Sequence, residues 1–156
     1  MNKLIILLKQ LNIIDQVSIL MHANLKKVVV HQNNEYSFYI ESKDFIPFEE
    51  YQLLINSGDQ FPYPIEFIFN YPDNFSYEQD WSYYLGYIIE KMKLLSPLFT
   101  SLKIEDIEIN QVIKIGVLNE IQLEQYQQLQ NRIKQLFKEI GLNKSFQFYI
   151  KEDVAE

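Results

Sequence analysis

Apolar residues near the start of the chain recur at helical spacing, and the pattern from Leu4 to Leu11 predicts a short amphipathic helix. Further along, β-branched and aromatic residues alternate with polar ones, which is typical of strands. Residues 32–35 favour a turn and separate two such strands, so a hairpin is expected. In order, the first half is predicted to contain helices at 4–11 and 15–24, strands at 27–31 and 36–41, a helix at 47–55 and a strand at 65–71.

The second half opens with a longer apolar stripe at helical spacing, preceded by Ser76 and Gln79 in the arrangement of a capping box. Gly141 suits the end of another long helix. The pattern predicts a helix at 77–95, one further turn at 98–102, a strand at 107–118, a helix at 119–140 and a strand at 146–150. The expected fold class is α+β, with the order α-α-β-β-α-β followed by α-β-α-β.

Proline, aspartate and asparagine cluster between residues 72 and 76, and such a cluster favours a connection over a helix or a strand. The sequence therefore predicts two subdomains, residues 1–72 and residues 76–156. Charge does not change at this point, and the pattern leaves open whether the two halves share one core.

The chain has 156 residues and a net charge of −7, and it contains no cysteine, which excludes disulfides and thiolate metal sites. The acidic balance, with Arg132 as the only arginine, disfavours a general electrostatic grip on nucleic-acid phosphates. No stretch is long and apolar enough to span a membrane, and the apolar run at the start is too short for a signal peptide. A cytoplasmic location is therefore expected.

Candidate chemistry is sparse. The two histidines, His22 and His31, do not stand in a metal-binding or catalytic spacing. Asp106 and Glu108 would share one face of a strand and could seat a divalent cation, although a solvated acidic strand entry explains them as well. Four glycines leave room for neither a P-loop nor a dinucleotide-binding turn. We therefore expect no catalytic, cofactor-binding or metal-binding residues.

The aromatic residues offer a different kind of site. Most of them fit strand faces and helix stripes, but five crowd around proline-rich connections, where exposed rings can anchor a protein partner. Packing of these loops onto their own subdomain is the alternative interpretation. The candidate partner contacts are Phe61, Tyr63, Tyr71, Phe75 and Tyr77.

A nucleic-acid-binding module that guides template or primer is the second hypothesis. The order of elements in the second half resembles the type II KH fold, but Gly86 and Gly116 are isolated and the Gly-x-x-Gly loop is missing. The hypothesis requires that lysines gather on one face despite the negative net charge. The lysines concerned are Lys91, Lys93, Lys103 and Lys114. A free-standing enzyme is a third hypothesis, which would need convergent polar groups in one pocket.

Several segments together resemble the N-terminal region of PolC, the DNA polymerase III alpha subunit of low-G+C Gram-positive bacteria and mollicutes. The resemblance lies in their order and spacing, because each is a packing pattern and none is a catalytic signature. The segments are Leu7–Ile13, Lys26–His31 with Tyr36–Ile40, Phe45–Phe48 leading to Tyr51 and Leu54, Trp81 opening a helix that ends at Ser96-Pro97, and a strand followed by a helix with Leu123, Tyr126 and Gly141.

The resemblance implies an accessory region of a larger enzyme, because the polymerase, exonuclease and metal-binding domains of that family lie beyond it. The first subdomain would be similar to the carboxy-terminal domain of the tau subunit, and the second would be KH-like. The implied role is non-catalytic docking to other replisome proteins, with the clamp-loader tau subunit as one candidate partner.

Overall fold

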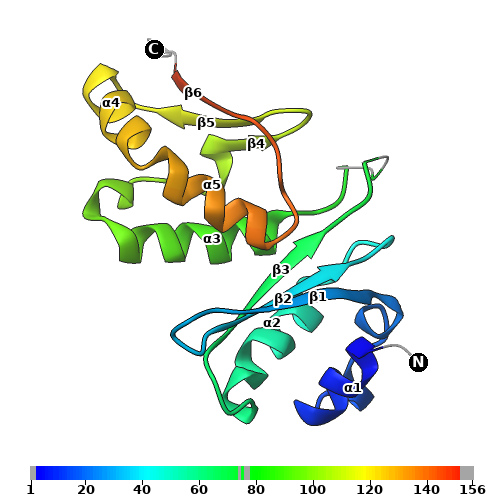
Figure 1. Cartoon of the computed structure of the whole chain (residues 1–156). Coiled ribbons are helices and arrows are strands. Elements are labelled where there is room, and N and C mark those ends of the chain that lie inside the picture. Colours follow the sequence, from blue (N-terminus) through cyan, green and yellow to red (C-terminus); the bar gives the residue numbers. More distant parts are fainter. Residues whose placement is uncertain (1–2, 74, 76–77, 152–156) are drawn as a thin grey trace. The chain divides into compact units, whose positions relative to one another are not determined.

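The computed structural model describes residues 3–73, 75 and 78–151. The chain divides into two compact units, one formed by Met1–Phe75 with Glu139–Gly141 and the other by Ser76–Lys138 with Leu142–Glu156. Each unit is mixed α and β, so the predicted α+β class is confirmed (Figure 1). No helix within the described residues is long and apolar enough to cross a membrane.

The N-terminal unit is a three-stranded sheet with helices on one side (Figure 1). Strands β1 and β2 form an antiparallel hairpin, and β3 then pairs with β2 in parallel, so α2 is the crossover between them. The elements are α1 (Lys3–Gln10), two 3-10 turns (Ile14–Gln16 and Leu20–His22), β1 (Asn24–Val30), β2 (Tyr36–Glu41), α2 (Phe48–Asn56), a 3-10 turn (Ser57–Gln60) and β3 (Ile65–Asn70).

Burial of apolar side chains between the helices and the sheet forms the core of this unit. Leu4 and Leu8 of α1 and Leu54 of α2 are completely buried, as is Ile40 at the centre of β2. The hydrophobic effect of removing these side chains from water is the main force that holds the helices against the sheet.

A buried carboxylate connects α2 to the segment before β1. Glu50 is 7% exposed, and its two side-chain oxygens accept hydrogen bonds from the backbone N–H groups of Ser18, Ile19 and Leu20 at 2.9–3.3 Å. The Ser18 hydroxyl donates a further bond at 3.3 Å. Because the N–H groups of Ile19 and Leu20 are occupied by Glu50, they cannot bond to carbonyls one turn back, as the α-helix expected over this segment would require.

The C-terminal unit has the same strand pairing. Strands β4 and β5 are antiparallel, and β6 returns beside β5 in parallel. The elements are α3 (Ser82–Leu95), two 3-10 turns (Pro97–Phe99 and Ile104–Asp106), β4 (Ile107–Ile109), β5 (Ile113–Val117), α4 (Glu120–Gln128), α5 (Gln130–Glu139) and β6 (Phe146–Ile150). Both units therefore run helix, hairpin, helical crossover and third strand, although no sequence repeat signals it.

Ring contacts fix the two crossover helices of the C-terminal unit against its sheet. Phe137 of α5 meets Phe146 edge to face at 5.3 Å, and Tyr126 of α4 meets Phe148 at 6.0 Å. Phe99 packs against the other side of Tyr126, at 4.7 Å between ring centroids. The alternation in β6 therefore directs Phe146 and Phe148 towards the helices and leaves Tyr149 on the opposite face.

Three predicted elements were wrong in detail. The helix expected at 15–24 is replaced by two 3-10 turns, because Glu50 takes the N–H groups that would build it. The strand expected at 107–118 is a hairpin, in which Asn110 turns the chain by donating to the Val112 carbonyl at 3.3 Å. The helix expected at 119–140 is interrupted at Leu129, whose N–H bonds three residues back to Tyr126.

The other predicted elements are confirmed, with small shifts at their ends. The helix expected at 77–95 begins at Ser82, and the side chain of Asp80 accepts the Ser82 N–H at 3.0 Å. Of the expected capping box, Ser76 lies outside the described residues. The strands at 36–41 and 146–150 have the predicted bounds.

The Glu50 network predicts a large stability cost for its removal. In Glu50→Ala, one buried and two partly buried N–H groups lose a charged acceptor, and we expect a loss of about 2–4 kcal/mol in the free energy of unfolding. Glu49→Ala is the matched control, because Glu49 is exposed in the same turn of α2, and it should cost less than about 1 kcal/mol. Urea denaturation of both variants measures the difference, and equal losses would contradict the role of Glu50.

Two glycines of the C-terminal unit should respond to alanine in opposite directions. A Cβ on Gly86, inside α3, would meet only Ile104 Cδ1 at 3.9 Å, so Gly86→Ala should stabilise by about 0.5–1 kcal/mol. A Cβ on Gly116, in β5, would lie 2.8 Å from Lys151 Cγ and 3.2 Å from Tyr149 Cζ, so Gly116→Ala should destabilise. Urea midpoints that move in the same direction for both variants would contradict this prediction.

Candidate protein-contact surface

Two of the predicted partner contacts lie on the N-terminal sheet. Phe61 and Tyr63 follow the 3-10 turn after α2, and Tyr63 stacks on Tyr36 of β2 at 5.3 Å with the rings 6° apart. Phe61 meets Tyr36 at 5.2 Å and Phe38 at 5.4 Å, both edge to face. The loop thus packs on its own unit, yet Tyr63 remains 44% exposed.

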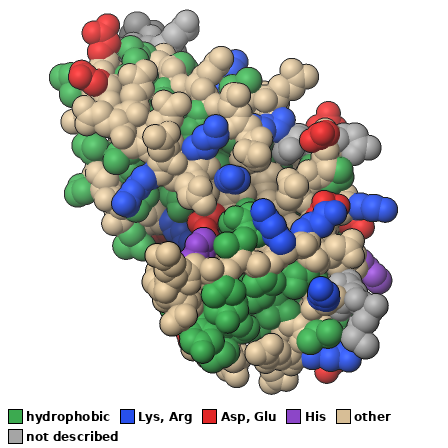
Figure 2. Space-filling model, in the orientation of Figure 1, with side chains coloured by type: hydrophobic (Ala, Val, Ile, Leu, Met, Phe, Trp, Pro, Cys, Tyr) green, Lys and Arg blue, Asp and Glu red, His purple; other side chains and the backbone are tan. Residues whose placement is uncertain are grey.

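The exposed face continues onto β1. Val30 pairs with Tyr36 and Val28 with Phe38, so both valines lie on the same face of the sheet as the aromatic rings. Val28 is 42% exposed and Val30 55% exposed. We call Val28, Val30, Tyr36, Phe61 and Tyr63 the apolar strip. Figure 2 shows hydrophobic side chains gathered as one group over the N-terminal unit.

Sequence reasoning missed the two valines of the strip. They stand in a run of three valines that reads as an ordinary strand, and nothing in that run says which valines are covered. The available signal was the hairpin register, because it places alternate β1 residues opposite Tyr36 and Phe38.

The other predicted aromatic contacts form a separate cluster. Tyr71 stacks on Phe75 at 4.2 Å, with Phe45 at 6.4 Å from Tyr71. Tyr71 is only 5% exposed, and its hydroxyl oxygen accepts the backbone N–H of Ile46 at 3.0 Å. This cluster holds the segment before α2 in place, and Tyr71 offers a partner less exposed surface than Tyr63 does. Tyr77 lies outside the described residues.

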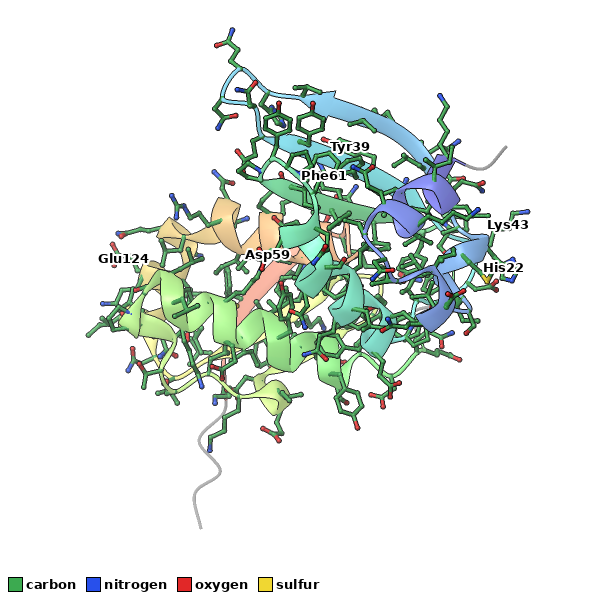
Figure 3. The ribbon with its side chains drawn as sticks, turned by 90° about the horizontal axis from the view of Figure 1, so that it is seen from below. His22, Tyr39, Lys43, Asp59, Phe61 and Glu124 are labelled. Carbon is green, nitrogen blue, oxygen red and sulfur yellow. The ribbon has the colours of Figure 1, made fainter. Side chains whose placement is uncertain are left out.

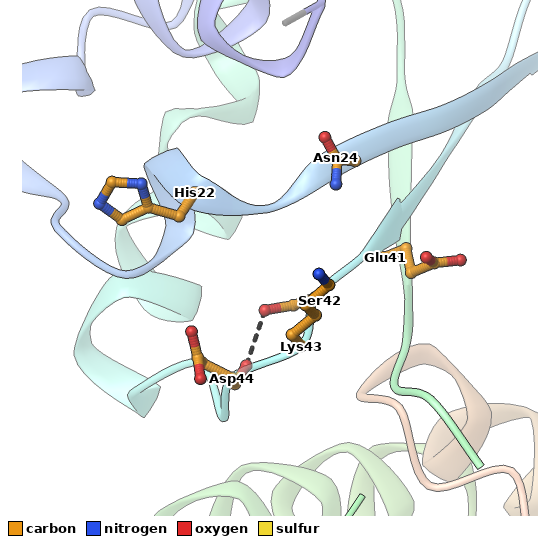
Figure 4. A pocket seen from close by; sticks show the side chains of 6 residues that line it. All are labelled: His22, Asn24, Glu41, Ser42, Lys43 and Asp44. Carbon is orange, nitrogen blue, oxygen red and sulfur yellow. Dashed lines mark hydrogen bonds between the residues drawn. The ribbon is translucent and has the colours of Figure 1, made fainter. Parts of the chain in front are cut away.

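A small polar cavity lies at the start of β1 and the end of β2 (Figure 4). Its volume is about 220 Å³, and the Ser42 hydroxyl donates to the Asp44 carbonyl at 2.7 Å. In Figure 4 the His22 ring and the Glu41 carboxylate point away from each other, so these two side chains do not converge on one point. The cavity is smaller and more polar than a usual ligand pocket. Its lining residues are His22, Asn24, Glu41, Ser42, Lys43 and Asp44.

A row of three hydrogen-bonded side chains crosses the N-terminal sheet, namely His31 just after β1, Ser37 of β2 and Glu66 of β3. His31 Nε2 lies 2.9 Å from the Ser37 Oγ, and the Ser37 hydroxyl donates to Glu66 Oε2 at 3.1 Å. These are the residue types of a hydrolase triad, but a triad places histidine between serine and carboxylate. Here serine is in the middle and is 1% exposed, so it cannot act as a nucleophile on a substrate.

The predicted acidic pair does not form a cation site. Asp106 lies in a 3-10 turn, where it accepts the Lys103 N–H at 3.0 Å and pairs with Lys151 at 2.8 Å, while Glu108 is in β4. The two carboxylates therefore do not share one strand face. Within the residues that the structure describes, no group of three or more histidine, aspartate or glutamate side chains could hold a metal ion.

Acidic neighbours accompany two of the four lysines named for nucleic-acid binding. Lys93 lies 3.8 Å from Glu90, and Lys114 is the register partner of Glu108. Lys91 instead lies over the Tyr87 ring, 4.8 Å from its centroid. Carboxylates beside Lys93 and Lys114 reduce the positive field that a phosphate backbone would meet there.

Comparison with known proteins gives one family match. Residues 3–57 match the N-terminal domain of a DNA polymerase III, and the family is DNA polymerase III polC-type N-terminus I. The predicted resemblance to the N-terminal region of PolC is thereby confirmed over the segment from α1 to the end of α2. No curated protein matches the chain.

The buried phenol of Tyr126 gives a measurable alkaline transition. Burial, and secondarily the negative charge of Asp106, raise the pKa of Tyr126 from 10.0 to about 12. The unfolded chain therefore loses this proton first as the pH rises, and the contribution of Tyr126 to stability should fall between pH 10 and about 12. We expect Tyr126→Phe to lose less stability than the parent chain over this range in urea denaturation. An identical pH dependence would contradict the shift.

Proposed function

We propose that this chain is a non-catalytic interaction region of a PolC-type DNA polymerase III alpha subunit, and that it docks to other replisome proteins through the apolar strip. The supporting observation is the strip itself, which lies on the unit that carries the family match. DNA synthesis and proofreading would then be activities of the parent protein, which would work in the cytoplasm.

The composition of the strip supports a protein partner. Stacked tyrosines provide large contact area with few rotatable bonds, and valines add apolar area without charge. Protein interfaces are depleted of charged residues at their centre, and no member of the strip is charged. A burial of Val28, Val30 and Tyr63 by a partner would also remove three of the most exposed apolar side chains of this unit from water.

We infer the finer architecture from the order of elements. The N-terminal unit corresponds to the part expected to be similar to the tau carboxy-terminal domain, residues 1–72. The C-terminal unit, expected over 76–156, runs helix, hairpin, two helices and strand, which supports a KH-like order. Residues 128–131, between α4 and α5, contain no glycine, so a KH-type clamp on a nucleic-acid backbone would have no Gly-x-x-Gly loop there.

Docking through the strip predicts a specific binding defect. Tyr63→Ser should weaken binding of the chain to its replisome partner at least about tenfold, because the outermost ring of the strip is lost. The clamp-loader tau subunit and the sliding clamp are the first partners to test, by calorimetry. Tyr83→Ser is the matched control, since Tyr83 is 71% exposed on α3 and outside the strip, and it should bind within about twofold of the parent.

Three outcomes would decide against this proposal. If Tyr63→Ser and Tyr83→Ser weaken binding equally, the apolar strip is not part of the interface. Absence of binding to both candidate partners at tens of micromolar would count against docking. Salt-dependent binding of single-stranded DNA by the parent chain would favour the alternative of a nucleic-acid module.

A further inference from the structure

Strand β1 is one of the two edge strands of the N-terminal sheet. The hydrogen bonds of β2 show which backbone groups of β1 point outward. The N–H groups of Tyr36 and Ser42 donate to carbonyls on the β3 side, at Pro64 and Asn70. Even-numbered residues of β2 therefore face β3, and odd-numbered ones face β1. Val28 and Val30 pair with Phe38 and Tyr36, so they direct their own N–H and C=O groups away from β2.

These outward backbone groups lie at the open side of the sheet. The sheet order is β1-β2-β3, and Figure 3 shows β1 as the outermost strand of the unit. The side chains of Val28 and Val30 are both exposed, so no described part of the N-terminal unit covers this edge closely. An edge with free N–H and C=O groups is a template for pairing with another strand.

The charges along β1 have one sign. Lys26 and Lys27 are the only charged residues of the strand, and both are exposed. Lys27 lies over the Tyr39 ring at 4.5 Å, on the sheet face opposite to the apolar strip, and Lys26 is in the bulge between Leu25 and Lys27. Lys26 also pairs with Glu41 at 3.5 Å, so Lys27 is the cation of β1 that a partner could meet, on the face opposite to the apolar strip.

We infer that an extended segment of a partner protein adds to β1 as a fourth strand, with apolar residues on one face and acidic residues on the other. The inference rests on the proposed docking function and names the kind of partner segment. The backbone bonds would come from Val28 and Val30, apolar contacts from the apolar strip, and charge complementarity from Lys27. A second copy of this chain fits less well, because pairing β1 with itself would bring four lysines into one short ladder.

The test uses the chain of residues 1–156 and a displayed pool of random peptides of about twelve residues, long enough to span an edge strand. The selected peptides should alternate apolar and acidic residues. At saturation, hydrogen exchange followed by NMR should slow at the amides of Val28 and Val30. Three results would overturn the inference. They are selection of basic or helix-patterned peptides, unprotected amides at both valines, and failure to select any binder.

A proline variant separates backbone pairing from side-chain contact. Val28→Pro removes an N–H that the β1–β2 ladder does not use, so the sheet can form, and it should weaken peptide binding at least about tenfold. Val28→Ala, which keeps the N–H, should bind within about threefold of the parent. Val30→Pro has the same logic and serves if Val28→Pro fails to fold by circular dichroism. Equal binding by the proline and alanine variants would overturn strand addition.

Further experiments test the charge on β1 and the nature of the partner. Lys27→Glu should weaken binding of the selected peptides, and added salt should no longer reduce that binding, because repulsion replaces attraction. If binding of a replisome partner depends on Tyr63 but not on the Val28 N–H, the docking proposal is supported and strand addition is contradicted. If sedimentation shows a dimer that Val28→Pro dissociates, a second copy of the chain occupies the edge. The inference of an acidic partner segment is then overturned.

Discussion

The carboxylate of Glu50 joins two parts of the N-terminal unit that lie about thirty residues apart in the sequence. It stands in the first turn of α2 and takes the N–H groups of Ser18, Ile19 and Leu20, just before β1 begins. Three consecutive donors on one buried acceptor hold this segment in tight turns and fix where the chain enters the sheet. The position of β1, and with it the apolar strip, depends on this contact.

The proposed docking function draws on the apolar strip and not on the polar networks of the described residues. Several polar groups of the described residues are engaged with one another in short local networks, such as His31 with Ser37 and Glu66, or Asp106 with Lys151. Satisfied groups of this kind stabilise a fold, but they do not converge on an open space where a reacting atom could sit. The apolar strip is the opposite case, because its side chains remain in water although apolar burial is the main source of stability.

The same strand pairing serves both units and leaves the first and third strands at the edges of each sheet. In the N-terminal unit the edge strand β1 carries two lysines, and charges on an edge strand oppose self-association. In the C-terminal unit the third strand β6 is uncharged, and Tyr149 lies across Gly116 on its outer face. Closely similar topology therefore need not imply the same use of the surface.

The sequence by itself determined the α+β class, most of the helices and strands, and the family resemblance, because each of these depends on local periodicity or on the order of segments. It also indicated Phe61 and Tyr63 as candidate partner contacts, because aromatic residues beside prolines can be recognised from the order of residues alone. Only the tertiary structure decided that Val28 and Val30 extend that surface and that Tyr71 is buried. Exposure depends on which strands pair and which side chains cover them, and residues distant in the sequence decide both. For the same reason the helix expected at 15–24 was lost to Glu50, a carboxylate about thirty residues away whose preference for buried N–H groups no local pattern reveals.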